Sequence, residues 1–272
     1  MAPLSVGIVP FLNARPLTHG LERRSDIFLD TDVPAALIER LRAGDLDIAL
    51  VSSIELFRRD GYRMLPGLGV ASRGPVESVL LFGRRPIEAA QSLSLDTSSR
   101  SGEALARIVL EQFHHRPPLA IRYDAPTAEL HQVEADLALR IGDPALRTAR
   151  ASFATVVDLG EQWTQHTGLP FVYAVWIVRP GAKLQGREHL FYEARAAGRA
   201  ALRSIATAAA SQLDLPFASM MHYLEHCVQH DLGPAHMTAL AEFRDRAARL
   251  GMARADLAVA LQPVRENVVE RS

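Results

Sequence analysis

The chain has 272 residues, of which 48% are hydrophobic and 22% are charged, a composition typical of a globular protein with room for two domains. Its formal net charge of −1 gives no electrostatic basis for binding nucleic acid or an anionic membrane. No apolar run reaches the roughly 20 residues of a membrane span, and the first residues lack the pattern of a signal peptide. The single cysteine, Cys227, excludes an internal disulfide. These features predict a cytoplasmic location.

The first two thirds of the sequence alternate between strand and helix patterns. Apolar runs predict strands at 4–9, 27–29, 48–51, 79–82, 93–95, 119–123, 137–139, 156–159 and 171–178. Helical patterns fall between them at 34–42, 54–58, 102–112 and 127–134. This alternation predicts a mostly parallel sheet covered by helices on both faces.

The last third of the sequence is helical, with helices expected at 189–212, 216–229 and 234–250. Two α/β lobes joined by crossings near 82–86 and 172–178 fit this order. The predicted first lobe comprises residues 1–83 and 179–272, and the predicted second lobe comprises residues 84–178.

Polar side chains follow several of the predicted strands. Asn13 and Arg15 come directly after the first strand, Ser52 and Ser53 follow the third, and the turn before the 79–82 strand carries serines at 72 and 78. Open α/β sheets bind ligands outside the carboxyl ends of their strands. The loops are therefore expected to converge on one cleft that suits a small polar ligand.

The segment from Ser98 to Ser101 has three serines around Arg100 at a helix start. Helix N-termini bind carboxylates, so the segment is a candidate anion site. The alternative is an ordinary N-cap, which needs only one of the three serines. For Asn13 the alternative is an Asx turn, and Arg15 and Arg100 have the alternative of solvated surface charges. One of Ser52 and Ser53 is expected to cap a helix while the other faces the cleft.

Six segments carry a family resemblance, at 10–17, 44–53, 72–79, 95–101, 141–143 and 163–171. In this order the chain resembles the chorismate dehydratases of the futalosine route to menaquinone, over about residues 4–180. The resemblance implies a type II periplasmic-binding-protein-like fold, with two α/β lobes, a central cleft and two crossing strands. It also implies a carbon–oxygen lyase that needs no cofactor and removes water from chorismate to give 3-[(1-carboxyvinyl)oxy]benzoate.

The expected site follows from these segments. Asn13 and Ser78 are the candidate catalytic residues. The candidate substrate-binding residues are Arg15, Ser52, Ser53, Ser72, Ser98, Ser99, Arg100, Ser101, Ile141 and Gly142. Chorismate, a small dicarboxylate, is the expected partner; nucleic acid and membrane are not, and a homodimer is left open.

The proton acceptor is less evident from the sequence. The sister enzyme that acts on cyclic dehypoxanthine futalosine carries a histidine at the end of the matching strand, where an ungapped reading places Arg140. This difference favours the dehydratase. We expect a carboxylate of chorismate itself to remove the proton; the rival is Asp143, whose alternative role is a helix N-cap before Pro144.

Three histidines lie at i, i+4 and i+8 of the predicted 216–229 helix and its end: His222, His226 and His230, with Cys227 beside them. The spacing is compatible with a metal site, but a solvated helix face is the favoured interpretation, and no metal is expected. The aromatic residues Trp163, Phe171, Tyr173 and Trp176 are expected in the core or at the hinge, although Phe171 or Trp176 could wall a bound ring.

Three other classes remain as alternatives. An exported solute receptor would need an export signal, and a transcription regulator would need a helix-turn-helix ahead of the clamp. The sister enzyme would need its histidine. We expect neither an export signal nor a helix-turn-helix in this protein, and Arg140 stands where the sister enzyme has its histidine.

Overall fold

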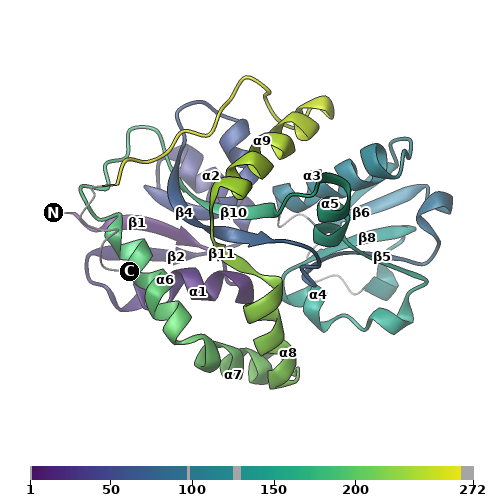
Figure 1. Cartoon of the computed structure of the whole chain (residues 1–272), viewed down its shortest axis with the longest axis horizontal. Helices are drawn as coiled ribbons and strands as arrows, with labels where there is room; N and C mark the ends of the chain where they lie inside the picture. Colours follow the sequence, from purple (N-terminus) through teal and green to yellow (C-terminus); the bar gives the residue numbers. More distant parts are fainter. Residues whose placement is uncertain (1, 97–98, 125–129, 265–272) are drawn as a thin grey trace.

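The computed structural model describes residues 2–96, 99–124 and 130–264, and within them the strands form two sheets that lie side by side (Figure 1). In the first sheet the order is β11 (Gln229–Asp231), β4 (Arg63–Ser72), β10 (Phe171–Val178), β3 (Ile48–Ser52), β1 (Leu4–Ile8) and β2 (Ile27–Thr31). In the second it is β7 (Ala120–Asp124), β6 (Ser92–Asp96), β8 (Leu137–Ile141), β5 (Val79–Gly83) and β9 (Thr155–Asp158).

Both sheets are mixed rather than mostly parallel. Parallel pairing joins β1 to β2 and β3, and joins β6 to β7 and β8. The strands β10 and β5 run antiparallel to both of their neighbours. Each of these two strands enters its sheet from the other sheet, so it runs against the βαβ units around it. The prediction of a mostly parallel sheet is wrong for this reason.

The chain passes between the sheets twice. It leaves the first sheet after β4 and joins the second at β5, through residues 73–78, and it returns from β9 to β10 through α5 (Leu159–Thr167). The expected crossings at 82–86 and 172–178 lie later in the sequence than these passages. Sheet pairing puts β5 with the second sheet and β10 with the first, so we propose lobe boundaries at 73–78 and 159–170 instead of those predicted.

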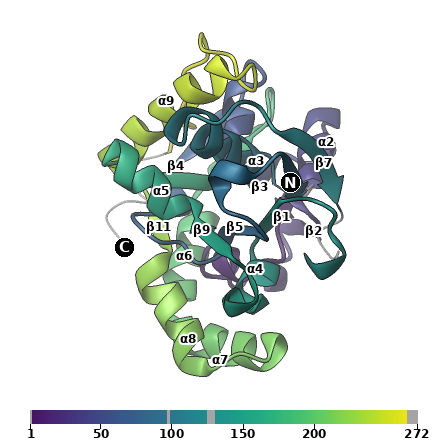
Figure 2. The same cartoon turned by 90° about the vertical axis from the view of Figure 1, so that its right-hand side faces the viewer.

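Helices cover the sheets and make up most of the C-terminal third of the chain. The α-helices besides α5 are α1 (Arg15–Thr18), α2 (Pro34–Ala43), α3 (Arg100–Arg107), α4 (Asp143–Arg147), α6 (His189–Ala200), α7 (Leu202–Leu213), α8 (Phe217–His222) and α9 (Pro234–Arg249). Short 3₁₀ helices span Leu12–Ala14, Leu21–Arg23, Ser53–Phe57, Ile87–Ala89, Leu130–Gln132 and Arg150–Ser152, and π-helical turns span Ile108–Phe113 and Tyr223–Cys227. Figure 2 shows α7 and α8 on the opposite side of the molecule from α9.

Several helix boundaries follow local chemistry. Pro34 starts α2 and Gly44, with φ of 92°, ends it, as expected of a proline at N1 and a glycine in the left-handed region. The predicted 189–212 helix is two helices that break at Ala201. The predicted 216–229 helix ends at Cys227, and the next residues pair with β4 as β11. His230 therefore lies on a strand and not on the helix face that the sequence suggested.

One apolar cluster extends through both sheets and the helices around them. Trp163, Phe171 and Trp176 have no exposed surface, and the rings of Trp163 and Phe171 meet edge to face with centroids 5.0 Å apart. The core interpretation of these aromatic residues is confirmed, and Phe171 and Trp176 are not among the residues that line the cavity described below. Within the described ranges, none of the helices combines the length and apolar character needed to cross a membrane.

Candidate active site

A narrow cavity of about 40 Å³ lies where the two sheets face each other. The first sheet and its loops contribute Val9, Phe11, Asn13, Pro34, Leu50, Val51, Ser52, Val70, Tyr173 and Ala174. The second sheet and the passage into it contribute Val76, Ser78, Val79, Ser99, Gly102 and Ile141. The lining is apolar with a few amide and hydroxyl groups, which is the usual composition of a small-molecule site.

The loop after β1 places Asn13 in this cavity, as the sequence predicted. Two contacts from distant parts of the chain hold the loop. The Nε2 atom of His230 lies 2.8 Å from the main-chain oxygen of Asn13, and the N–H of Leu12 donates to the Asp143 carboxylate at 2.9 Å. The carbonyl accepts only if Nε2 carries the proton, which fixes the tautomer of His230. Asn13 is thus positioned by both sheets.

Ser78 also lines the cavity, at the start of β5. Its hydroxyl oxygen accepts a 2.8 Å hydrogen bond from the hydroxyl of Tyr223, so the serine proton remains available to a ligand. The preceding turn is held by Asp158, the N-cap of α5, whose carboxylate accepts from the main-chain N–H groups of Val76 and Glu77. The passage between the sheets is therefore firmly anchored next to the cavity.

The remaining serines divide into two groups. Ser52 and Ser99 line the cavity from opposite sheets with their hydroxyl oxygens 3.5 Å apart, and Ser99 also caps α3 by accepting from the N–H of Gly102. Ser53 and Ser101 are fully buried. Ser53 donates to the main-chain oxygen of Val172 at 2.6 Å, and its oxygen lies 3.2 Å from that of Ser101.

Ser53 and Ser101 join the lobes outside the cavity, and Ser101 further accepts from the N–H of Ile54. Ser72 is likewise buried, 2.9 Å from the hydroxyl of Tyr173. Its own atoms do not line the cavity, but it orients a tyrosine that does. Ser53, Ser72 and Ser101, which were expected to bind substrate, thus lie behind the residues that line the cavity.

Both candidate arginines lie away from the cavity. Arg15 donates to the side chain of Gln212. Arg100 pairs with Glu103 at 3.3 Å and lines a different surface hollow, next to α2. Gly142 donates its N–H to the main-chain oxygen of Ser78 and lies behind the lining. Ser98 falls outside the described residues.

Arg140 and Ile141 are neighbours on β8, but their side chains lie on opposite faces of the sheet. Ile141 lines the cavity, and the side chains of consecutive strand residues point to opposite faces. Arg140, buried and bonded to the main-chain oxygen of Leu139, therefore points to the face away from the cavity. Arg140, which the ungapped reading aligns with the histidine of the sister enzyme, therefore supplies no base to the cavity.

Burial dominates the electrostatics of this region. It raises the pKa of the Tyr173 hydroxyl well above its ordinary value and does the same to Tyr223, against opposing hydrogen bonds to Ser78 and Asn13. Burial also raises the pKa of Asp143, while the Leu12 N–H opposes the shift. Tyr173 is the one titratable side chain among the described lining residues, so the cavity presents hydrogen-bonding groups and no ionised base.

Sequence reasoning missed Tyr173 and Tyr223 as site residues. Tyr173 was expected only in the core or hinge, and Tyr223 lies in the C-terminal third, where no motif marked it. Asp143 was considered as an N-cap, but Gly142 occupies that position and the carboxylate bonds Leu12 instead.

A larger hollow of about 570 Å³ lies on the first lobe, away from these residues. Three of its five arginines are paired with acids: Arg42 with Glu55, Arg179 with Asp47 and Arg254 with Asp60. Arg58 donates to the main-chain oxygen of Met252. The hollow contains none of the candidate site residues that the sequence predicted. The cavity between the sheets is therefore the candidate active site.

Comparisons with known proteins find relatives both in sequence and in structure. The chorismate dehydratase of Thermus thermophilus is 32% identical over 247 residues, which cover 82% of this chain and 88% of the relative. That of Campylobacter jejuni is 29% identical over 164 residues, covering 60% of this chain and 58% of the relative. Among solved structures, the periplasmic aliphatic sulphonate binding protein SsuA from Escherichia coli superposes with a TM-score of 0.63 at 17% identity, covering 98% of this chain and 94% of that chain.

The likeness to SsuA confirms the expected type II periplasmic-binding-protein-like fold. Residues 4–249 match the menaquinone biosynthesis family. With its match over most of the sequence and a relative above 30% identity, the chain belongs to the menaquinone biosynthesis family.

Proposed function

We propose that this protein is a hydro-lyase that converts chorismate to 3-[(1-carboxyvinyl)oxy]benzoate and water. The observation that carries the proposal is the 32% identity, over 82% of the chain, to a chorismate dehydratase. The cavity supports it independently, because its amide and hydroxyl groups come from both lobes around an apolar interior. A six-membered carbon ring with polar substituents suits such a lining.

The reaction breaks the bond between a ring carbon and its hydroxyl group and removes a proton from a neighbouring ring carbon. The electron pair of that C–H bond forms the new double bond, and the hydroxyl leaves with a proton as water. Aromatisation of the ring supplies the driving force. The protein needs to orient the ring and to stabilise the departing hydroxyl.

We assign the departing hydroxyl to Asn13 and Ser78. The Asn13 amide has N–H donors, and the Ser78 hydroxyl keeps its proton available because Tyr223 donates to its oxygen. Hydrogen bonds that strengthen as negative charge develops on the leaving oxygen accelerate the reaction. A substrate carboxylate is assigned to Ser99 and the N-terminus of α3, where main-chain N–H groups favour anions.

The proton acceptor in this proposal is a carboxylate of chorismate. Tyr173 is the one titratable group among the described lining residues, and its raised pKa keeps it protonated. A protonated phenol cannot act as a base. Asp143 lies behind the loop and is occupied by the Leu12 N–H.

The proposal is tested by incubating the purified protein with chorismate and following the products by mass spectrometry. The expected result is loss of chorismate with formation of the benzoate product in equal amount. Unchanged chorismate would refute the enzyme assignment, and tight binding without turnover would point to a solute receptor of the same fold. Turnover of cyclic dehypoxanthine futalosine instead would identify the sister enzyme. The cytoplasmic location stays a prediction from the sequence, and a homodimer stays open.

A further inference from the structure

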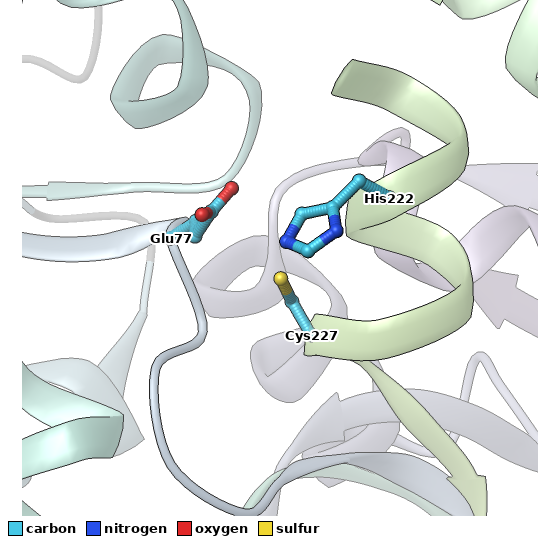
Figure 3. Close-up of side chains that lie close together, drawn as sticks. All are labelled: Glu77, His222 and Cys227. Atoms are coloured by element: carbon cyan, nitrogen blue, oxygen red, sulfur yellow. The ribbon is translucent and has the colours of Figure 1, made fainter. Parts of the chain in front are cut away.

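Three side chains that can bind a metal ion converge beside the passage between the sheets. They are Glu77 in that passage, His222 at the end of α8 and Cys227 at the end of the following π-helical turn. Their candidate ligand atoms all lie within 4.8 Å of one another. Figure 3 shows the carboxylate, the imidazole and the thiol pointing toward a common centre.

The π-helical turn explains why these residues meet. The N–H of Val228 donates to the oxygen of Tyr223, five residues earlier, instead of the four-residue step of an α-helix. The wider turn brings Cys227 beneath His222, which an α-helix would not do at a spacing of five residues. In the sequence, the i, i+4 and i+8 spacing drew attention to His222, His226 and His230 with Cys227 beside them, but nothing connected Glu77 to these residues.

The backbone of Glu77 is held in an uncommon conformation. Its φ of 62° lies in the left-handed region, which costs a residue other than glycine about 1 kcal/mol or more. The Asp158 carboxylate accepts the N–H of Glu77 at 2.7 Å and that of Val76 at about 3.0 Å. With the backbone anchored in this way, the Glu77 side chain faces α8 and the turn that follows it (Figure 3), and Glu77 does not line the cavity.

We propose that Glu77, His222 and Cys227 form a binding site for a divalent transition-metal ion, best suited to Zn²⁺. A thiolate, an imidazole and a carboxylate are ligands that Zn²⁺ accepts together, whereas Mg²⁺ and Ca²⁺ require oxygen ligands. Tetrahedral bonds of about 2.0–2.3 Å hold ligand atoms roughly 3.3–3.8 Å apart. Because His222 is exposed and Glu77 is partly exposed, side-chain rotation closes the remaining distance.

The site is next to the cavity but separate from it. Glu77 precedes Ser78, and His222 precedes Tyr223, whose hydroxyl bonds Ser78. A bound ion would tie the passage between the sheets to the C-terminal helices at the point where that hydrogen bond forms. Burial raises the pKa of the Cys227 thiol to about 12, so binding displaces the thiol proton into solution.

The test uses the metal ions themselves and the whole chain, after treatment with a chelator. Titration with Co²⁺ should produce the near-ultraviolet band of a cobalt–thiolate bond at a stoichiometry of one, and Zn²⁺ should abolish the band and raise the melting temperature. Cys227→Ser and His222→Gln should each weaken binding at least about tenfold, since even outer partners of a metal cost that much. Mg²⁺ should have no effect.

His226→Gln is the matched control. His226 is an exposed histidine on the same turn, with its ring centroid 5.2 Å from that of His222, but it does not belong to the three-residue cluster. It should bind Co²⁺ like the unchanged protein. Absence of the thiolate band, or equal loss of binding in His226→Gln and His222→Gln, would overturn the proposal. His222 is exposed, so His222→Gln should fold normally, and no part of the test depends on chorismate.

Discussion

His230 shows how a single residue in the C-terminal third supports the candidate site. It is 4% exposed and bonds the main-chain oxygen of Asn13. The sequence pattern suggested a solvated helix face for it. The outcome is different because the chain leaves the helix at Cys227 and adds β11 to the first sheet. His230 is thus a positioning residue for Asn13.

The protonation of His230 predicts a pH dependence of stability. Burial, opposed by the hydrogen bond to Asn13 and by Asp231 and aided by Arg195, lowers its pKa to about 4 from 6.5. Between these values the folded chain binds fewer protons than the unfolded chain, so the free energy of unfolding falls as the pH falls, by up to about 1.4 kcal/mol per pH unit.

Urea unfolding at pH ~7.5 and ~5 measures this change, and His230→Gln, which keeps an N–H donor for Asn13, should reduce it. An equal loss of stability in both proteins would show that His230 does not titrate as described. His230→Ala should lower kcat, and His230→Gln, which keeps the donor, should restore part of it. That order of kcat values would further support the positioning role.

Asp143→Asn distinguishes the two candidate proton acceptors. The variant keeps an oxygen to accept the Leu12 N–H but cannot act as a base. If a substrate carboxylate removes the proton, kcat on chorismate stays near that of the unchanged protein. A general base contributes about 10²–10⁴-fold, so a decrease of that size with an unchanged melting temperature would identify Asp143 as the base.

At the scale of elements, the packing of α6 against α1 depends on Gly198. A Cβ atom at this position would lie 2.2 Å from the main-chain oxygen of Pro16 and 2.7 Å from its carbonyl carbon. Both contacts are with backbone, so the helices would have to separate. Since α1 directly follows the Asn13 loop, this close approach also sets the position of the loop.

Gly198→Ala should therefore destabilise the protein by about 1–3 kcal/mol, although alanine favours a helix by roughly 1 kcal/mol. Thermal or urea unfolding measures the change. Ala197→Gly, at an exposed position of the same helix, is the matched control and should cost only the helix propensity. A more stable Gly198→Ala variant would contradict the close packing.

The elements that the sequence predicted are those with a local signal. The strands β3, β5 and β8 are buried along their whole length, and such strands are continuous apolar runs. β4 escaped prediction because Pro66, Gly67 and Gly69 resemble a turn, and β11 escaped because Gln229–Asp231 is polar. Both are strands only because partners from distant parts of the chain pair with them.

The site shows the same division. Asn13, Ser52 and Ser78 were predicted from polar positions next to strands, Ser99 from a helix start and Ile141 from the family resemblance. All five line the cavity. Tyr223 and the meeting of Glu77 with His222 and Cys227 could not be predicted, because a π-helical turn and a long-range contact place them. Arg15 and Arg100 were predicted from their places on a strand-to-helix loop and a helix start, and in the structure they bond Gln212 and Glu103 instead.

At the scale of the whole molecule, the cavity volume implies that the lobes move. It holds about 40 Å³, whereas pockets for organic ligands occupy about 300–1,000 Å³. Substrate entry and product release therefore need the lobes to separate, as the clamp-like fold allows. Ser52 and Ser99 face each other across this gap, 3.5 Å apart.

A disulfide at these two positions tests the motion. In the double variant Ser52→Cys/Ser99→Cys, oxidation should stop turnover of chorismate. Treatment of the oxidised variant with a reductant should restore its activity. The single variants should not respond to the reductant. Equal activity of the oxidised and reduced double variant, with the crosslink verified by mass spectrometry, would show that lobe separation is not required.

The most direct test of the account is the steady-state kinetics of Asn13→Ala on chorismate. If the amide acts on the departing hydroxyl in the transition state, kcat should fall by about 10²-fold or more with a much smaller change in KM. Ser204→Ala, an exposed hydroxyl on α7, should behave like the unchanged protein. A variant Asn13→Ala with undiminished kcat would contradict the placement of the chemistry in the cavity between the two sheets.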